Sequence, residues 1–220
     1  MFTKGDTILF TGDSITDCGR NKTDENINEN AAGWGYANIL KAEFLHDYPH
    51  LDLTIHNRGI GGNRIVDLYG RAKEDCYNLR PNVVSILIGI NDIWAEYKRG
   101  TGVEPDRFRK VYDLLLTETR ERFPDVKFVL METFCLGDGA EQCESAEKWH
   151  AELAERQAIV KELAQKHNAI FVPLQAVFDE ACKKAPYTYW LYDGVHPTGA
   201  GHMLIAQAWK NVVFKHGSPE

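Results

Sequence analysis

Three side chains near opposite ends of this 220-residue chain have the types and spacing of an activated nucleophile. Ser14 lies in residues 11–17 (TGDSITD), and Asp193 and His196 lie three positions apart in residues 193–197 (DGVHP). A histidine that is oriented by a carboxylate can take the proton from a serine hydroxyl, which makes the oxygen nucleophilic. The pattern predicts attack on a carbonyl, with Ser14 as nucleophile, His196 as general base and Asp193 as the residue that orients the ring.

This chemistry requires the two motifs, which lie near opposite ends of the chain, to be close in space. The strands and helices between them must therefore bring them together. Apolar, β-branched runs predict strands at 7–11, 53–57, 83–89, 128–132 and 169–172. Amphipathic stretches between them predict helices at 35–47, 64–78, 105–122, 145–167 and 199–214, with a short one at 174–183.

Strands that alternate with helices predict βαβ units and a parallel sheet covered on both faces. We therefore expect an α/β protein, a single domain over residues 1–220 with a five-stranded sheet in a three-layer α/β/α sandwich. Ligands in such folds bind beyond the carboxyl ends of the strands. The polar loops at 18–33 and 133–144 follow predicted strands, so we expect them to shape substrate entry.

Two further polar blocks directly follow predicted strands. Residues 57–63 (NRGIGGN) follow the second strand, and residues 89–92 (GIND) follow the third. The first of these blocks has a rival interpretation as a dinucleotide-binding loop, but that fingerprint needs a glycine where Arg64 stands. Other structural interpretations remain for single residues: Ser14 as a helix N-cap, His196 as a turn residue, and Asn91 as the cap of a helix that begins at Asp92.

With these blocks in this order, the chain resembles the SGNH hydrolases, also called the GDSL esterase/lipase superfamily. The resemblance covers nearly the whole chain and implies the flavodoxin-like SGNH fold. It implies an oxyanion hole made by the backbone N–H groups of Ser14 and Gly62 and the side chain of Asn91. Fixed donors of this kind stabilise the negative charge that develops on an ester carbonyl under attack. The resemblance implies neither a cofactor nor a metal.

Longer strings sharpen the resemblance. Residues 12–20, 88–94 and 195–202 are similar to those of the bacterial intracellular acetylxylan and xylo-oligosaccharide esterases of this superfamily. The resemblance implies deacetylation of carbohydrates. The alternatives within the superfamily are a short-chain alkyl esterase and a lysophospholipase or thioesterase, and outside enzymes a catalytically silent binding module.

Aromatic rings beside the predicted catalytic residues suit a sugar, whose C–H faces pack on them. The candidate substrate-binding residues are Asp13, Trp94, Trp190 and Tyr192. We expect loop residues such as Asp17 or Arg20 to hydrogen-bond the sugar. Trp34, after the first long loop, is expected to serve mostly in packing.

Composition limits the partners and the location. The net charge of −7 argues against nucleic-acid binding, and no apolar stretch is long enough to span a membrane. No apolar leader precedes the first strand, and the odd number of cysteines, without paired spacing, indicates free thiols in a reducing compartment: Cys18, Cys76, Cys135, Cys143 and Cys182. We therefore expect a cytoplasmic enzyme with a small-molecule or oligosaccharide ester as its substrate. Relatives of this type can self-associate, so a homo-oligomer is a further expectation.

Overall fold

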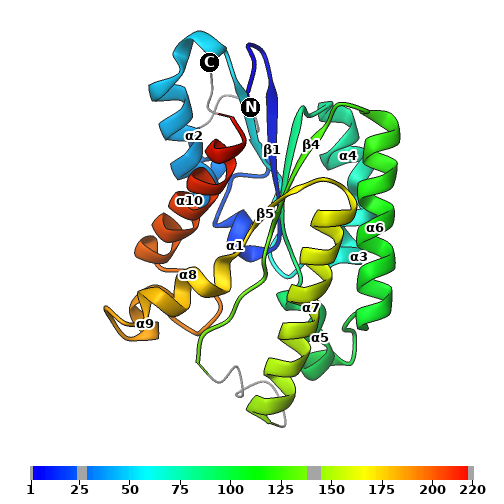
Figure 1. The fold of residues 1–220 in the computed structure, drawn as a ribbon, viewed down its shortest axis with the longest axis vertical. Coiled ribbons are helices and arrows are strands. Elements are labelled where there is room, and N and C mark those ends of the chain that lie inside the picture. The colour runs from blue at the N-terminus through cyan, green and yellow to red at the C-terminus, as the bar shows by residue number, and fades with distance from the viewer. Residues whose placement is uncertain (1, 24–28, 138–144, 218–220) are drawn as a thin grey trace.

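The computed structural model describes residues 2–23, 29–137 and 145–217, and its centre is a parallel sheet (Figure 1). Five strands pair in the order β2-β1-β3-β4-β5, all parallel. All five predicted strands are present, with ends that differ by one or two residues: β1 Thr7–Gly12, β2 Thr54–Asn57, β3 Val83–Leu87, β4 Lys127–Met131 and β5 Ile170–Val172. The α/β/α sandwich with a five-stranded parallel sheet is confirmed.

The middle strands are apolar on both sides because helices cover both faces of the sheet. In β1, Ile8 and Phe10 pack into one core while Leu9 packs into the other. In β4, Val129 packs into the same core as Ile8 and Phe10, and Phe128 packs into the same core as Leu9. Successive side chains of a strand point to opposite faces, so each strand contributes to both cores.

One face is covered by α2 (Tyr36–Asp47), α8 (Leu174–Ala181) and α10 (Gly199–Val213), which lie to the left of the sheet in Figure 1. Trp209 of α10 is fully buried there, and its indole N–H donates to Ser85 Oγ of β3 at 3.0 Å. A buried indole needs such a partner, and Ser85 supplies it from inside the sheet.

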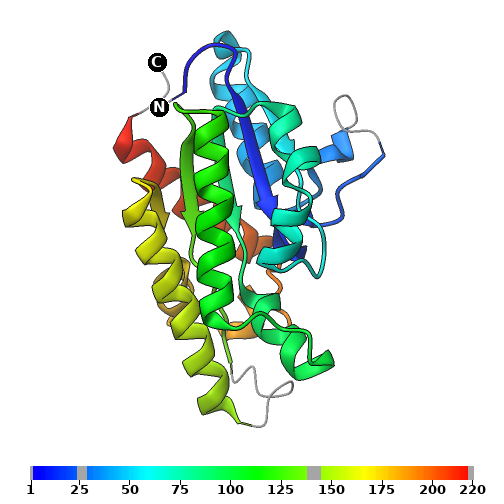
Figure 2. The ribbon, with the colours of Figure 1, turned by 90° about the vertical axis from the view of Figure 1, so that its right-hand side faces the viewer.

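The other face is covered by α3 (Ile65–Gly70), α4 (Ala72–Asp75), α6 (Pro105–Arg122) and α7 (Ala146–Lys166). Figure 2 looks onto this layer, where α6 runs along the sheet. The single helix predicted over 64–78 is wrong, because the chain leaves helical geometry at Arg71 between α3 and α4. The Arg71 guanidinium donates to Asn63 Oδ1 and Arg58 O, so contacts distant in sequence fix the break.

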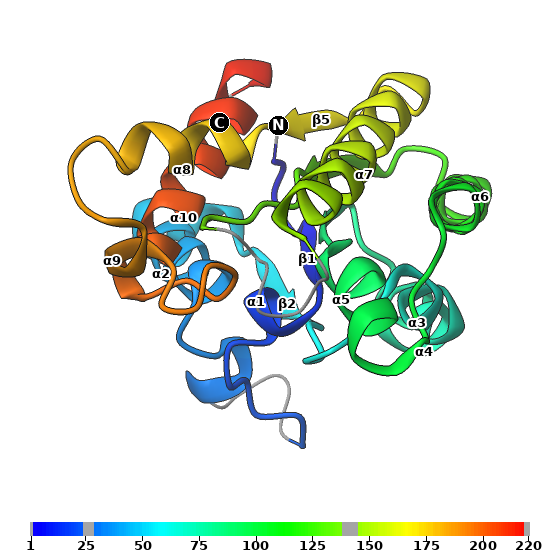
Figure 3. The same ribbon diagram turned by 90° about the horizontal axis from the view of Figure 1, so that it is seen from below.

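Three short helices were not predicted: α1 (Ser14–Asp17), α5 (Ile90–Arg99) and α9 (Tyr187–Trp190). Short 3₁₀ turns complete the described chain at Glu29–Ala32, Pro49–Leu51, Tyr77–Leu79 and Phe214–His216. All three short helices lie towards the end of the sheet opposite to the two termini (Figures 1 and 3).

The strand order changes direction at β1, which lies between β2 and β3. The loops that leave the carboxyl ends of β1 and β3 therefore diverge, and an open crevice at this point is where α/β folds bind ligands. No helix in the described ranges is long and apolar enough to cross a membrane.

Candidate active site

Ser14 lies just beyond the carboxyl end of β1, at the first position of α1. Gly12 ends the strand, and a Cβ there would lie 2.2 Å from Leu87 O of β3, so only glycine fits. Asp13 caps the helix by accepting the N–H of Ile15 at 2.9 Å. Ser14 is thus not the N-cap itself, and its half-buried side chain is left for other contacts.

The structure joins the two ends of the chain at Ser14. Ser14 Oγ lies 2.9 Å from His196 Nε2, and His196 Nδ1 lies 2.6 Å from Asp193 Oδ2. Because a carboxylate can only accept, Nδ1 carries the ring proton, and the Ser14 hydroxyl donates to Nε2. A hydroxyl that donates to an imidazole backed by a carboxylate is the arrangement that serine nucleophiles use.

Asp193 is held in place by the turn that it begins. Its Oδ1 accepts the backbone N–H groups of Val195 at 3.0 Å and His196 at 2.7 Å. Burial raises the pKa of Asp193, but the hydrogen bonds from the backbone and ring of His196 and from Val195 outweigh it and hold the pKa below its usual value. The carboxylate is therefore charged at neutral pH, as its role beside the imidazole requires.

The glycine loop, residues 57–62, is bound tightly to α1. Asn57 Nδ2 donates to Thr16 O at 2.6 Å, and a Cβ on Gly59 would lie 2.2 Å from Asp17 N. Asp17 Oδ2 accepts the N–H of Gly61 at 2.9 Å, and Arg20 Nε donates to Gly59 O at 2.7 Å. The loop that follows β2 is thereby fixed against the helix that carries Ser14.

The same loop and α5 bring the predicted oxyanion donors to this edge of the sheet. Gly62 is exposed and has φ +80°, a conformation that favours glycine. Asn91 lies in the first turn of α5, and its Nδ2 donates to Asn63 O at 3.2 Å, which leaves the second N–H of the amide for a ligand. The helix begins at Ile90 with Gly89 as its N-cap, so the interpretation of Asn91 as a cap before Asp92 is wrong.

Two of the aromatic candidates lie against the imidazole. The Tyr192 ring stacks on His196 with centroids 5.6 Å apart and planes 14° apart, and the Trp94 ring lies 5.9 Å from it at 41°. Trp190 is half-buried, packs against the core and donates its indole N–H to Ala185 O at 3.3 Å. These contacts make Trp190 a support of the segment that carries His196.

Two expectations for individual residues, Asp13 and Trp34, need correction. Asp13 is only 1% exposed, and burial raises its pKa to about 7, so it lies beneath the site and is closed to substrate. Asp17 and Arg20 are mostly buried and hold the glycine loop, but both also line a pocket that opens beside Ser14, so their contact with a sugar stays a prediction. Trp34, expected in packing, is 59% exposed. The capping role of Asp13 could have been predicted from the sequence, because aspartate is a favoured N-cap residue directly before a helix.

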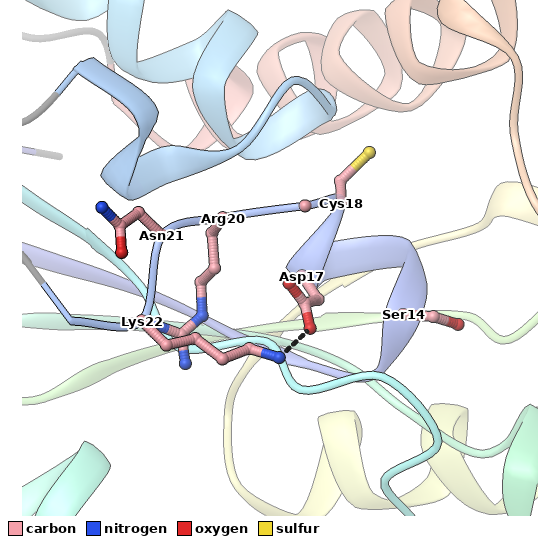
Figure 4. A pocket seen from close by; sticks show the side chains of 7 residues that line it. Ser14, Asp17, Cys18, Arg20, Asn21 and Lys22 are labelled. Atoms are coloured by element: carbon pink, nitrogen blue, oxygen red, sulfur yellow. Dashed lines mark ion pairs between the residues drawn. The ribbon is translucent and has the colours of Figure 1, made fainter.

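A pocket of about 430 Å³ opens beside Ser14 (Figure 4). Its wall runs along the chain from Ser14 through Asp17, Cys18, Gly19, Arg20 and Asn21 to Lys22. Lys22 Nζ forms an ion pair with Asp17 Oδ2 at 2.9 Å. The lining thus combines charged side chains, the anion Asp17 and the cations Arg20 and Lys22, with apolar surface. The residues described contain no group of three metal-ligating side chains. Most of the predicted loop 133–144, and Cys143 with it, lies outside the described residues, as does part of the loop 18–33.

Comparison with known proteins places this geometry among ester hydrolases. The chain is 35% identical over 209 residues to an acetylxylan esterase from Geobacillus stearothermophilus, which covers 93% of this chain and 92% of that protein. A solved structure of an acetylxylan esterase from the same organism has 33% identity and a TM-score of 0.85, with 99% of this chain and 97% of that chain covered. A Parabacteroides merdae structure, assigned as a GDSL-like lipase, has 38% identity and a TM-score of 0.91, with 96% of this chain and 97% of that chain covered.

Residues 10–204 match the GDSL-like lipase/acylhydrolase family, a span that runs from β1 to α10 and includes Ser14, Gly62, Asn91, Asp193 and His196. This chain, with its serine, imidazole and carboxylate in hydrogen-bonded contact, belongs to the GDSL-like lipase/acylhydrolase family.

Proposed function

We propose that this protein is a serine esterase that removes acetyl groups from acetylated carbohydrates of the xylo-oligosaccharide type. The observation that carries the proposal is the contact chain from Ser14 Oγ to His196 and on to Asp193, at 2.9 and 2.6 Å. Such a chain activates a hydroxyl for attack on an ester.

In the first half-reaction, Ser14 Oγ attacks the acetyl carbonyl carbon while its proton moves to His196 Nε2. The carbonyl oxygen takes the electron pair of the broken π bond, and the N–H groups of Ser14 and Gly62 and the Asn91 amide stabilise its charge. When the intermediate collapses, the C–O bond to the sugar breaks, and the imidazolium protonates the leaving sugar oxygen. The acetyl group remains on Ser14.

In the second half-reaction, His196 takes a proton from water as the water oxygen attacks the acetyl carbon. Collapse of this second intermediate returns the proton to Ser14 Oγ and releases acetate. Asp193 remains charged throughout and stabilises the imidazolium that forms in each half-reaction.

The relatives support both the residues and the substrate. Two structures of the Geobacillus stearothermophilus acetylxylan esterase are described as catalytic mutants, in one of which a serine and in the other an aspartate is replaced by alanine. Another structure of that enzyme is described as an acetyl-xylooligosaccharide esterase. The charged side chains of Asp17, Arg20 and Lys22 in the pocket wall beside Ser14 suit a hydroxyl-rich substrate better than a lipid chain.

The decisive test of the substrate compares kcat/KM on acetylated xylo-oligosaccharides with kcat/KM on nitrophenyl esters of increasing chain length. We expect acetate release from the sugars and a preference for acetate over longer acyl chains, since added methylenes overpack a small acyl slot. If octanoate esters react faster than acetate esters and the sugars release no acetate, the carbohydrate proposal is wrong and a lipase or thioesterase activity replaces it.

The nucleophile has a separate test. A serine-directed organophosphate should add once, at Ser14, as located by mass spectrometry of peptides. Ser14→Ala should neither be labelled nor hydrolyse nitrophenyl acetate. Labelling at another serine, with activity retained in Ser14→Ala, contradicts the assignment.

We further propose that the protein is cytoplasmic, that its substrate is a small-molecule or oligosaccharide ester, and that it binds neither nucleic acid nor a membrane. Four free cysteines in the described chain support a reducing compartment: Cys18, Cys76, Cys135 and Cys182. The net charge of −7 supports the exclusion of nucleic acid. Fractionation of cells that express the chain, followed by detection of the protein in the soluble cytoplasmic fraction, tests the location.

A further inference from the structure

Trp34 is exposed to solvent and yet firmly held. The residue is 59% exposed, and its backbone N–H donates to Cys18 O at 3.0 Å, which ties it to the turn after α1. Glycines flank it on both sides. A Cβ on Gly33 would lie 2.6 Å from Cys18 O, and one on Gly35 would lie 2.9 Å from Cys18 Sγ. Positions 33 and 35 can therefore be occupied only by glycine, because the backbone on both sides of Trp34 packs directly against Cys18, in the turn that follows α1.

The indole ring is fixed from a second direction by α10. It meets the ring of His202 edge to face, with centroids 5.2 Å apart and planes 85° apart. His202 is itself buried and immobilised, since its Nδ1 accepts the N–H of Tyr36 and its Nε2 lies 3.2 Å from Cys18 Sγ. The Trp34 ring thus rests on a rigid base while more than half of the residue faces water.

The ring packs against Gly19, a residue of the pocket wall beside Ser14. Trp34 Nε1 lies 3.3 Å from the point that a Cβ on Gly19 would occupy, and Gly19 is part of the pocket wall. Tyr192 is a second exposed aromatic residue of this site, 60% exposed, stacked on His196 and tied to it by a backbone N–H to His196 O at 3.0 Å. Two rigid, exposed rings are therefore attached to the two segments that carry the nucleophile and the imidazole.

An exposed aromatic ring that is held in place offers a flat apolar face to a ligand, because the unliganded ring keeps apolar area in contact with water. The wall between Ser14 and Lys22 adds the charged side chains of Asp17, Arg20 and Lys22, which can hydrogen-bond hydroxyl groups. A ligand that suits both an aromatic face and a polar wall has apolar C–H faces and hydroxyl edges, which is the chemistry of a pyranose ring.

We infer that Trp34 is a sugar-stacking residue that holds a sugar unit adjacent to the acetylated one, so that the enzyme selects oligosaccharides over acetylated monosaccharides. The inference rests on the proposed function. Tyr192, which lies beside the imidazole, contacts the acetylated sugar unit, and Trp34 stacks on the sugar unit next to it.

The experiment compares kcat/KM on acetylated xylotriose with kcat/KM on acetylated xylose, followed by acetate release. Wild type should prefer the trisaccharide, and Trp34→Ala should lower that preference roughly three- to tenfold, the usual effect of losing one aromatic contact. Trp34→Phe should keep most of the preference because it retains an aromatic face. Leu114→Ala, which removes an exposed apolar side chain from α6 on the opposite side of the sheet, should leave both substrates unaffected.

A binding measurement removes catalysis from the comparison. In the Ser14→Ala background, calorimetry with acetylated xylotriose should show a dissociation constant that Trp34→Ala raises by a similar factor. If wild type deacetylates both sugars and Trp34→Ala leaves their ratio unchanged, the inference is wrong while the proposed function stands. If wild type releases acetate from neither sugar, the proposed function fails first. If Trp34→Ala lowers the molecular mass in light scattering, Trp34 is a contact with a second copy of the chain, and the sugar-stacking role is overturned.

Discussion

The Asp193 carboxylate uses its two oxygens for different purposes. Oδ1 accepts two backbone N–H groups and fixes the turn, while Oδ2 accepts the ring proton of His196 at 2.6 Å. The first oxygen thus sets where the imidazole lies, and the second sets which of its nitrogens faces Ser14. A substitution that keeps the backbone hydrogen bonds but changes the partner of Nδ1 would separate the effect of the position of His196 from the effect of its tautomer.

Asp193→Asn is that substitution. The amide oxygen can still accept the backbone N–H groups, but the amide NH₂ would face Nδ1 and favour the tautomer with its proton on Nε2, which cannot accept from Ser14. We expect kcat on nitrophenyl acetate to fall about 10³–10⁴-fold. Thermal unfolding should be nearly unchanged, which shows that the turn has kept its structure. Activity within tenfold of wild type would contradict the role of Asp193.

Asn91 is the second residue whose chemistry can be isolated. One amide hydrogen is used on Asn63 O, and we propose that the other stabilises the developing oxyanion. We expect Asn91→Ala to lower kcat about 10²–10³-fold, the usual loss for one such donor, with little change in KM. Steady-state kinetics on nitrophenyl acetate measures both quantities. An unfolded variant, or one with unchanged kcat, would instead assign Asn91 a structural role.

Helix α1 and the glycine loop are in direct contact. Gly59 lies directly on the backbone of Thr16 and Asp17, and the Asp17 carboxylate accepts the N–H of Gly61. The position of Gly62, the next residue, therefore depends on a side chain of the helix that begins with Ser14. The segments that carry Ser14, the proposed nucleophile, and Gly62, the proposed oxyanion donor, are held to each other and not merely to the sheet.

Asp17 variants test this coupling. Asp17→Ala removes the acceptor for Gly61, so we expect kcat to fall about tenfold or more, because small misplacements of catalytic groups have large effects. Asp17→Asn retains an acceptor oxygen and should keep most of the activity. Lys22→Ala breaks only the ion pair with Asp17 and serves as the control. Equal losses in Asp17→Ala and Lys22→Ala would show that the ion pair matters and the loop contact does not.

For the molecule as a whole, two buried acids link stability to pH. Burial raises the pKa of both Asp13 and Asp92 from 3.8 to about 7. Between these values the folded protein keeps protons that the unfolded chain releases, so a rise in pH favours unfolding. The free energy of unfolding supplied by these two groups is greatest near pH 4 and is lost as the pH rises to about 7.

We expect Asp92→Asn to reduce this pH dependence. The asparagine oxygen can still accept the N–H of Ile65, as Asp92 Oδ1 does at 3.0 Å, but the side chain no longer ionises. Urea unfolding at pH 5 and pH 8 should show a smaller loss of stability in the variant than in wild type. Asp125→Asn, at an exposed position, is the control and should leave the loss unchanged. An identical loss in wild type and Asp92→Asn would contradict the buried proton.

Local patterns in the chain were sufficient to predict the strands and to select the candidate catalytic residues. The strands are short runs rich in apolar and β-branched residues, so all five could be predicted from the sequence. Pro105–Arg122 was predicted with both ends correct because Pro105 opens the helix and Pro124 follows it closely. Ser14, Gly62, Asn91, Asp193 and His196 could be selected because each follows a strand or lies in a turn, in an order typical of one family.

Tertiary contacts decided what local pattern cannot encode. Asp17 and Arg20 are polar residues close to Ser14 in sequence, but their hydrogen bonds to the glycine loop, about 40 positions further along the chain, form only when that loop packs on them. The break at Arg71 depends on acceptors in the preceding loop. Tryptophan is a residue type that usually packs in cores, but Trp34 is exposed. Its position is set by the close packing of Gly33 and Gly35 on Cys18, a contact between segments about 16 positions apart. Burial is a property of the whole packed molecule, so it is fixed only when distant segments meet.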